Sequence, residues 1–187
     1  MAIWELEQDS PAYQIARELI SRYHHHLAEA KIVLYASDKN KVKCNKVTCA
    51  EASKASSKMK ASTNADFTIT LFMTPWSDLN GDQKKACMDH ELTHCGVHYE
   101  PVTEQVGTAR RSGRARTKVV RDEYGRVQYT DTIKRDTETG EPKWRLYPHD
   151  LEEFRDIVQR HGIWDESIQS FKEALDSRDQ PVAESVQ

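Results

Sequence analysis

The sequence contains no long hydrophobic run. Hydrophobic residues make up 37% of its 187 residues and charged residues 30%, and the mean hydropathy is -0.79. A helix needs about 20 consecutive apolar residues to span a bilayer, and no stretch of this sequence comes near that length. We therefore expect a polar globular protein without a membrane-spanning segment.

The first residues also lack the features of a secretory signal. Residues 1–9 hold neither a basic segment nor an apolar one, and a signal peptide combines both. We therefore expect the protein in the cytoplasm. Its net charge is only -3, so no general attraction to nucleic acid is implied.

Cysteines are few, and their spacing does not complete a structural zinc site. Cys44 and Cys49 are separated by four residues, but no matching Cys/His pair follows them. A four-ligand zinc knuckle needs both pairs. We therefore expect these two residues, with Cys87 and Cys95, to be free thiols in a reducing cytosol.

The length of the chain fits one domain with its own hydrophobic core. No internal repeat and no second domain are visible in the sequence. We expect a single domain over residues 1–176, followed by a polar, disordered tail over residues 177–187.

Hydrophobic periodicity and capping signals predict where the helices and strands lie. The clearest strand covers residues 66–74, where apolar side chains recur with a period of two. Asn80 and Gln83 form a capping box that opens a central helix, and its apolar spacing continues to residue 99. Before the central helix we expect a helix over 10–30 that begins at Ser10-Pro11, a strand over 32–35, and a loop over 38–64 with a short helix near 49–58. After it we expect a loop over 101–116 and a β-meander over 119–146 with turns at Gly125 and Gly140. Two further helices should begin at Asp150 and Trp164.

The central helix carries the motif H-E-x-x-H, formed by His90, Glu91 and His94. Residues four apart lie on one face of a helix, with Cβ atoms about 6 Å apart. Both imidazoles can therefore reach one Zn²⁺, and Glu91 beside them can take a proton from a metal-bound water. This motif predicts metal-assisted hydrolysis of a peptide bond, with Glu91 as the general base.

A catalytic zinc site needs a third protein ligand and one open position for water. His149, just before a predicted helix, is the better candidate, and Glu152 or Glu153 are alternatives. His98 would lie about 6 Å further along a continuous helix than His94, which makes it a poor third ligand. Tyr147 or His98 could instead donate a hydrogen bond to the developing oxyanion.

Two further runs of polar residues are interpreted as surface. Consecutive helix residues point in different directions, so His24, His25 and His26 cannot converge on one ion. We expect these three side chains to be solvated or half-buried.

The stretch Arg110–Arg121 carries six basic residues and no acid. It could contact nucleic acid or an acidic partner, but a solvated loop is the favoured interpretation because no aromatic residues interleave with the charges.

The motif at His90–Gly96, followed by a turn-rich meander and then His149–Phe154, resembles the phage metallopeptidase family, which is itself similar to the SprT-like zinc proteases. SprT-like proteins place their third zinc histidine in an H-G-x-x-F pattern at the start of a later helix. Here His149 is followed by Asp150 instead of glycine, and one extra residue precedes Phe154. The resemblance covers about residues 32–162, and the C-terminal zinc ribbon of the SprT-like proteins is missing.

The resemblance implies a zincin-like α+β fold, in which a small mixed or antiparallel sheet packs on the active-site helix. It also implies a zinc-dependent metallopeptidase that acts on a protein or peptide and is encoded by a phage, so that the cytoplasm is that of the bacterial host. Two alternatives remain open. One is a zinc-containing binding protein that acts on a host factor without cleaving it. The other is an SprT-like protease that cuts DNA-bound proteins and uses the Arg110–Arg121 run as its anchor.

Overall fold

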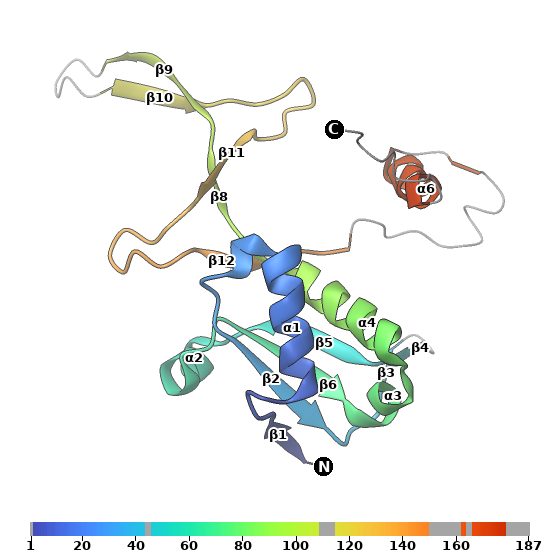
Figure 1. Ribbon diagram of the computed structural model, residues 1–187. Coiled ribbons are helices and arrows are strands. Elements are labelled where there is room, and N and C mark those ends of the chain that lie inside the picture. The colour runs from blue at the N-terminus through green and yellow to red at the C-terminus, as the bar shows by residue number, and fades with distance from the viewer. Residues whose placement is uncertain (1, 44–45, 109–114, 150–161, 164–165, 179–187) are drawn as a thin grey trace, which may run out of the picture. The chain divides into compact units, whose positions relative to one another are not determined.

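The computed structural model describes residues 2–43, 46–108, 115–149, 162–163 and 166–178. The chain divides into two compact units, Met1–Tyr147 and Pro148–Gln187. Helices and strands are mixed along the chain (Figure 1), so the predicted α+β class is confirmed. None of the described helices is long and apolar enough to cross a membrane.

A four-stranded mixed sheet forms the centre of the first unit. Its strands run in the order β1-β2-β6-β5, with β2 parallel to β6 and the outer pairings antiparallel. Strand β6 is therefore an interior strand, and both of its faces are largely buried. The bounds are β1 Ile3–Glu5, β2 Ile32–Ser37, β5 Ala50–Lys54 and β6 Phe67–Phe72.

The helices α1 and α4 lie beside each other and share one hydrophobic core with the sheet (Figure 1). Tyr13 and Leu19 of α1, Ile69 of β6, and Met88 and Leu92 of α4 are all buried in this core. The bounds are α1 Pro11–Arg22, the 3-10 helix η1 His25–Leu27, α2 Ser57–Thr63, α3 Met73–Asp78, α4 Gly81–His94 and, in the second unit, α6 Glu166–Arg178.

The remaining strands form small antiparallel pairs in place of a second large sheet. The short strand β7 pairs with β12, β8 with β11, β9 with β10, and β3 with β4. The predicted turns are present, since Gly125 and Gly140 both have positive φ, a conformation that favours glycine. The bounds are β3 Lys41–Lys43, β4 Lys46–Thr48, β7 Cys95–Val97, β8 Tyr99–Pro101, β9 Thr103–Thr108, β10 Ala115–Val119, β11 Tyr129–Ile133 and β12 Trp144–Leu146.

Several predicted boundaries were wrong. The first helix ends at Arg22 and not at residue 30, and the central helix ends at His94 and not at residue 99. Residues 38–64 are not mainly a loop, because they form β3, β4, β5 and α2, and residues 101–116 include β9. The central helix ends early because Cys95–Val97 pairs with Trp144–Leu146, and β5 forms by pairing with β6. Local periodicity cannot reveal either of these partners.

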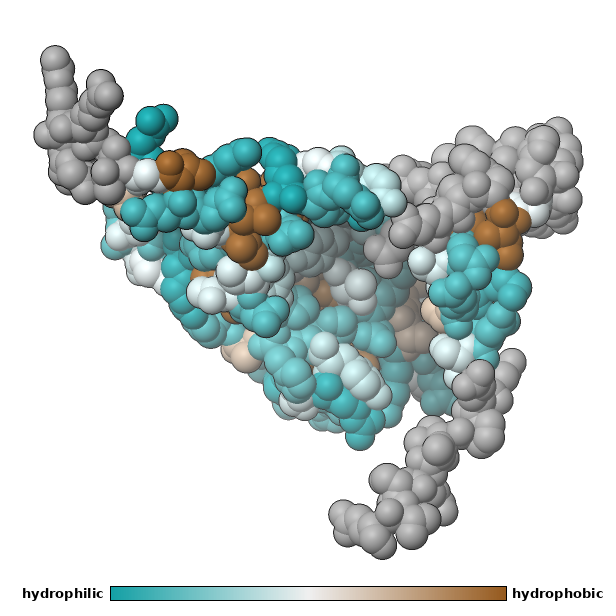
Figure 2. All heavy atoms as spheres, turned by 90° about the horizontal axis from the view of Figure 1, so that it is seen from above, coloured by the Kyte–Doolittle hydropathy of each residue, from teal (hydrophilic) through white to brown (hydrophobic). Residues whose placement is uncertain are grey.

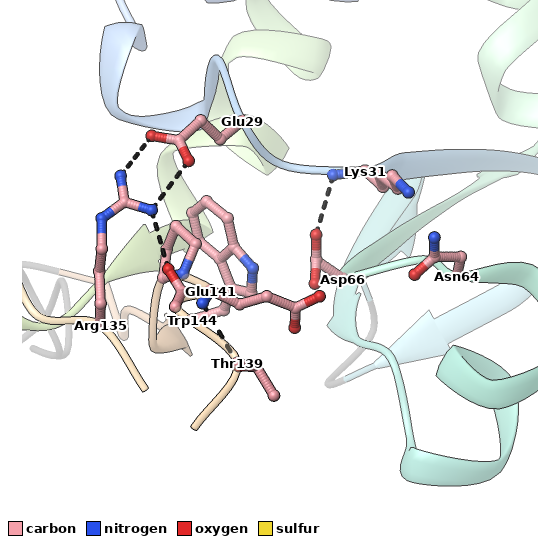
Figure 3. A pocket seen from close by; sticks show the side chains of 10 residues that line it. Glu29, Lys31, Asn64, Asp66, Arg135, Thr139, Glu141 and Trp144 are labelled. Atoms are coloured by element: carbon pink, nitrogen blue, oxygen red, sulfur yellow. Dashed lines mark hydrogen bonds and ion pairs between the residues drawn. The ribbon is translucent and has the colours of Figure 1, made fainter. Parts of the chain in front are cut away.

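Ion pairs fasten the segment between β11 and β12 to the main sheet. Arg135 binds both carboxylate oxygens of Glu29, at 2.6 and 3.0 Å, and Figure 3 shows this pair facing the Trp144 side chain. Lys60 bridges Asp66 and Glu141, at 2.8 and 2.7 Å. These contacts position the segment that leads into β12.

The face of the molecule seen in Figure 2 is predominantly hydrophilic. In Figure 2, hydrophobic residues appear on the visible face as separate patches among hydrophilic ones. This distribution agrees with the low mean hydropathy of the sequence.

Candidate metal centre

The helix α4 presents the motif residues in three different environments. The predicted capping box is confirmed, since the Asn80 side chain accepts from the Gln83 N–H and the Gln83 side chain accepts from the Asn80 N–H. Leu92, on the buried face of the helix, fixes how α4 is rotated against the sheet. As a result His90 is exposed, His94 is half-buried and Glu91 is buried.

The imidazoles of His90 and His94 face each other through their Nε2 atoms, which are 3.3 Å apart. Two nitrogens bound at about 2.0–2.1 Å to one tetrahedral Zn²⁺ lie about 3.3 Å apart. The observed spacing therefore fits two ligands of a shared ion. Partial desolvation of the ring, and then the neighbouring His94, lower the pKa of His90, which favours the neutral imidazole that a metal requires.

Tyr147 fixes the orientation and tautomer of His94. The Nδ1–H of His94 donates to the Tyr147 carbonyl at 2.8 Å, so its Nε2 carries the lone pair. The Tyr147 N–H in turn donates to the His94 carbonyl at 2.8 Å. The Tyr147 ring lies against Gly96, where a Cβ would come within 1.9 Å of a ring carbon, and its hydroxyl donates to the Val97 carbonyl at 2.7 Å. Since that hydroxyl is engaged, this structure does not favour Tyr147 as an oxyanion donor.

The third histidine follows two residues after Tyr147. One ring nitrogen each of His90, His94 and His149 lies within 4.8 Å of the other two, so the three residues could hold a metal ion. No other group of three potential ligands meets this criterion among the residues that the structure describes. The alternatives Glu152 and Glu153 lie outside those residues.

His98 does not lie where the sequence predicted it. Because α4 ends at His94, His98 follows β7 and its N–H donates to the Lys143 carbonyl at 2.9 Å. The sequence argument against His98 as a ligand assumed that α4 continues to His98, and that assumption was wrong. It is absent from the described histidine group for a different reason, namely that the chain leaves the helix before reaching it.

The general-base candidate Glu91 is held by the edge strand of the main sheet. Its Oε2 accepts a hydrogen bond from the Ala52 N–H of β5 at 2.7 Å. Burial, and secondly the charge of Glu91, raise the pKa of Cys87 and of Cys95 to about 12. Both thiols are thus neutral near pH 7, so neither offers a thiolate nucleophile.

Two histidines of the His24–His26 run contact residues directly before and after the pair His90 and His94. His24 is buried, contrary to the solvated or half-buried environment predicted for it, and its Nε2 lies 2.6 Å from Asp89 Oδ1. His26 is half-buried, and its Nε2 donates to the Cys95 carbonyl at 3.1 Å. These contacts attach the start of η1 to Asp89, just before His90 in α4, and to Cys95, the residue after His94.

Sequence reasoning missed the two backbone groups that hold the motif. The Ala52 N–H and the Tyr147 carbonyl carry no side-chain signature, because every residue except proline offers the first and every residue offers the second. The glycine that follows the motif was the available signal for Tyr147. Gly96 leaves room for an aromatic ring beside His94.

The basic run is described only in part. Arg116 and Lys118 lie on β10 and are exposed, while Arg110, Arg111 and Arg114 lie outside the described residues. Contact with nucleic acid through this run therefore stays a prediction.

Comparisons with known proteins give the family of the chain. No curated protein and no solved structure matches it. The family described as "Putative phage metallopeptidase" matches residues 4–175, which is nearly the whole chain and includes all three histidines of the candidate centre. The chain belongs to this phage metallopeptidase family.

Proposed function

We propose that this protein is a zinc-dependent metallopeptidase that hydrolyses peptide bonds in a protein or peptide substrate. The observation that carries the proposal is the Nε2–Nε2 distance of 3.3 Å between His90 and His94, with the buried carboxylate of Glu91 between them in the sequence. Membership of a metallopeptidase family supports the same reaction class.

In this proposal His90, His94 and His149 hold the metal. Three imidazole nitrogens suit Zn²⁺ and leave a fourth position for water or substrate, as in other catalytic zinc sites. When bound, zinc supplies an acidified water near neutral pH and polarises the scissile carbonyl. The Tyr147 carbonyl accepts a hydrogen bond from the His94 Nδ1–H, which leaves the Nε2 lone pair available for the metal.

Glu91 acts as the general base. Its carboxylate takes a proton from the attacking water and later gives it to the leaving amine. The Ala52 N–H, at 2.7 Å, restrains one carboxylate oxygen. Because Ala52 lies on the outermost strand of the sheet, the same strand that aligns the base lies beside the reacting centre.

Among the described strands, none pairs with the outer edge of β5, and we propose that an extended substrate binds there. The Cys49 carbonyl and the Ala55 N–H, just outside the strand, both bond toward β6. In an antiparallel pair the backbone groups alternate in direction, so those of Ala50, Ala52 and Lys54 point away from β6. A substrate backbone can pair with this edge by strand addition, apart from the N–H of Ala52 that Glu91 occupies.

The test is cleavage of unfolded casein by zinc-loaded protein, with new amino termini identified by mass spectrometry. Glu91→Gln should retain its zinc and lose cleavage by about 10³-fold or more, because the base and its charge are removed. Glu104→Gln, a matched change at an exposed position on β9, should leave cleavage unchanged. Full cleavage by Glu91→Gln, or none by the wild type with zinc bound, would contradict the proposal.

A further inference from the structure

Four cations influence His98, which follows His94 of the candidate metal centre by four residues. The backbones of Lys134, His98 and Lys143 bond to one another in a closed triangle, with N···O distances of 2.7–2.9 Å. Arg145 is paired with Gly96 across β7 and β12, and Lys54 of β5 reaches the Trp144 carbonyl with its Nζ. We call Lys54, Lys134, Lys143 and Arg145 the cationic face.

All four charges of the cationic face act on the His98 side chain. His98 has a lowered pKa, first through burial and then through Arg145, Lys54, Lys134 and Lys143. The four charges named here are all cationic, so each of them disfavours a proton on the His98 ring.

Two short backbone paths connect the cationic face to the metal centre. Lys54 is two residues along β5 from Ala52, whose N–H touches Glu91. Arg145 is two residues before Tyr147, whose carbonyl holds His94, and its guanidinium lies 4.7 Å from the Tyr147 ring centre. Two residues of a strand span about 6.6 Å. This length is close to that of one substrate residue with its side chain, so a substrate bound at the metal centre could reach the cationic face.

The face has unsatisfied charge and a space beside it. Within the described part of the chain, Lys143 has one carboxylate nearby, that of Asp136 at 3.7 Å, and no ion pair is found for Lys54, Lys134 or Arg145. A cavity of about 400 Å³ is lined by Lys54, His98, Lys143 and Trp144 on this side. The lining also includes Lys60 and three acids, Asp66, Asp136 and Glu141. Asp66 and Glu141 pair with Lys60, and Asp136 lies near Lys143, so Lys54 is the lysine of the lining without a carboxylate partner among the described residues.

We propose that the cationic face and this cavity form a specificity subsite that binds an acidic side chain of the substrate. The inference rests on the proposed peptidase function, and it assigns the subsite to the substrate residues that lie beyond Ala52 in the direction of Lys54. A carboxylate placed in the cavity would accept charge-assisted hydrogen bonds from Lys143 or Lys54, which line it, while Lys134 and Arg145 add positive charge nearby. The substrate class is therefore a protein segment with aspartate or glutamate near the cleaved bond.

The test uses binding and does not depend on turnover. The zinc-loaded Glu91→Gln protein is titrated against two fluorescein-labelled octapeptides that are identical except for glutamate or glutamine at every second position. At low ionic strength the glutamate peptide should bind about 10-fold more tightly by fluorescence anisotropy, as expected for one or two charge-assisted contacts. Adding Lys134→Gln and Lys143→Gln should abolish that preference, and these two changes leave the contact between Arg145 and Tyr147 in place.

A matched pair of changes provides the control. Arg116→Gln with Lys118→Gln removes two charges from β10 and should leave the preference for glutamate intact. Zinc content and circular dichroism of each variant check that the fold is retained. The proposal is overturned if both peptides bind equally, if neither binds measurably, or if the β10 changes weaken the glutamate peptide as much as the Lys134 and Lys143 changes do.

The same experiment separates this inference from the proposed function. A glutamate preference in a protein whose wild type cleaves no peptide would support the subsite and contradict the peptidase. Cleavage by the wild type with no preference for acidic residues would support the peptidase and overturn the subsite. Displacement of the peptide by duplex DNA with an affinity set by Lys134 and Lys143 would assign the face to nucleic acid instead.

Discussion

The two sides of the candidate metal centre are built in different ways. On one side, α4 is anchored by side chains that are wholly buried, among them Met88 and Leu92. On the other, Tyr147 follows β12, whose strand partner is the three-residue β7 and whose last residue, Leu146, is 40% exposed. The comparison shows that the core pre-arranges the candidate ligands His90 and His94, whereas a few specific contacts hold Tyr147, the residue that orients His94.

The largest effect should follow a change at the junction of the two sides. In Gly96→Ala the new Cβ would overlap the Tyr147 ring, at 1.9 Å, and move the carbonyl that orients His94. We expect a loss of about 1–3 kcal/mol in the free energy of unfolding from overpacking, and zinc affinity about 10–100-fold weaker from the lost second-shell contact. Chemical denaturation and zinc titration measure the two effects.

Gly81→Ala is the matched control. Nothing lies within 4 Å of a Cβ at the start of α4, so this change should leave both the unfolding free energy and the zinc affinity near their wild-type values. If Gly96→Ala behaves in the same way, Tyr147 does not hold His94 as described.

Two valines in strands compare the core with the exposed strand pairs directly. Val97 of β7 is fully buried, whereas Val106 of β9 is 56% exposed. Val97→Ala should reduce the free energy of unfolding by about 2–3 kcal/mol, and Val106→Ala by less than about 0.5 kcal/mol. Equal losses in urea denaturation would mean that β9 is as tightly packed as the core.

The smallest of the expected changes concerns the hydroxyl that fixes the Tyr147 ring. Tyr147→Phe removes its hydrogen bond to the Val97 carbonyl and keeps the ring against Gly96. A loss of about 1 kcal/mol in unfolding free energy is expected. Peptidase activity should persist, since the hydroxyl already bonds within the protein. A complete loss of activity with normal stability would instead make this hydroxyl a catalytic donor.

The sequence predicted the helix side of the centre well. Asn80 and Gln83 are adjacent in the chain to the helix they cap, and the i, i+4 spacing of His90 and His94 is a local property. Both features require only neighbouring residues, so periodicity and capping rules suffice to find them. The strand at Ile32–Tyr35 belongs to the same class, because the apolar run that predicts it is local, whereas its pairing with β1 and β6 is not.

The other side depends on contacts between distant residues. The apolar spacing continued past His94 through Cys95 and Tyr99, yet the chain leaves the helix because Cys95–Val97 pairs with Trp144–Leu146. Strand β5 was missed because Ala50–Lys54 holds no β-branched or aromatic residue, and such residues give strands their usual signal. Its placement follows from pairing with β6, and with it comes the Ala52 contact to Glu91.

The most direct test of the central claim is metal analysis of three purified proteins after exchange into zinc and removal of the excess. Wild type and His98→Ala should each retain one zinc ion per chain, and His149→Ala should retain much less, because two histidines alone bind weakly. Stoichiometric zinc in His149→Ala together with its loss from His98→Ala would contradict the ligand set of His90, His94 and His149.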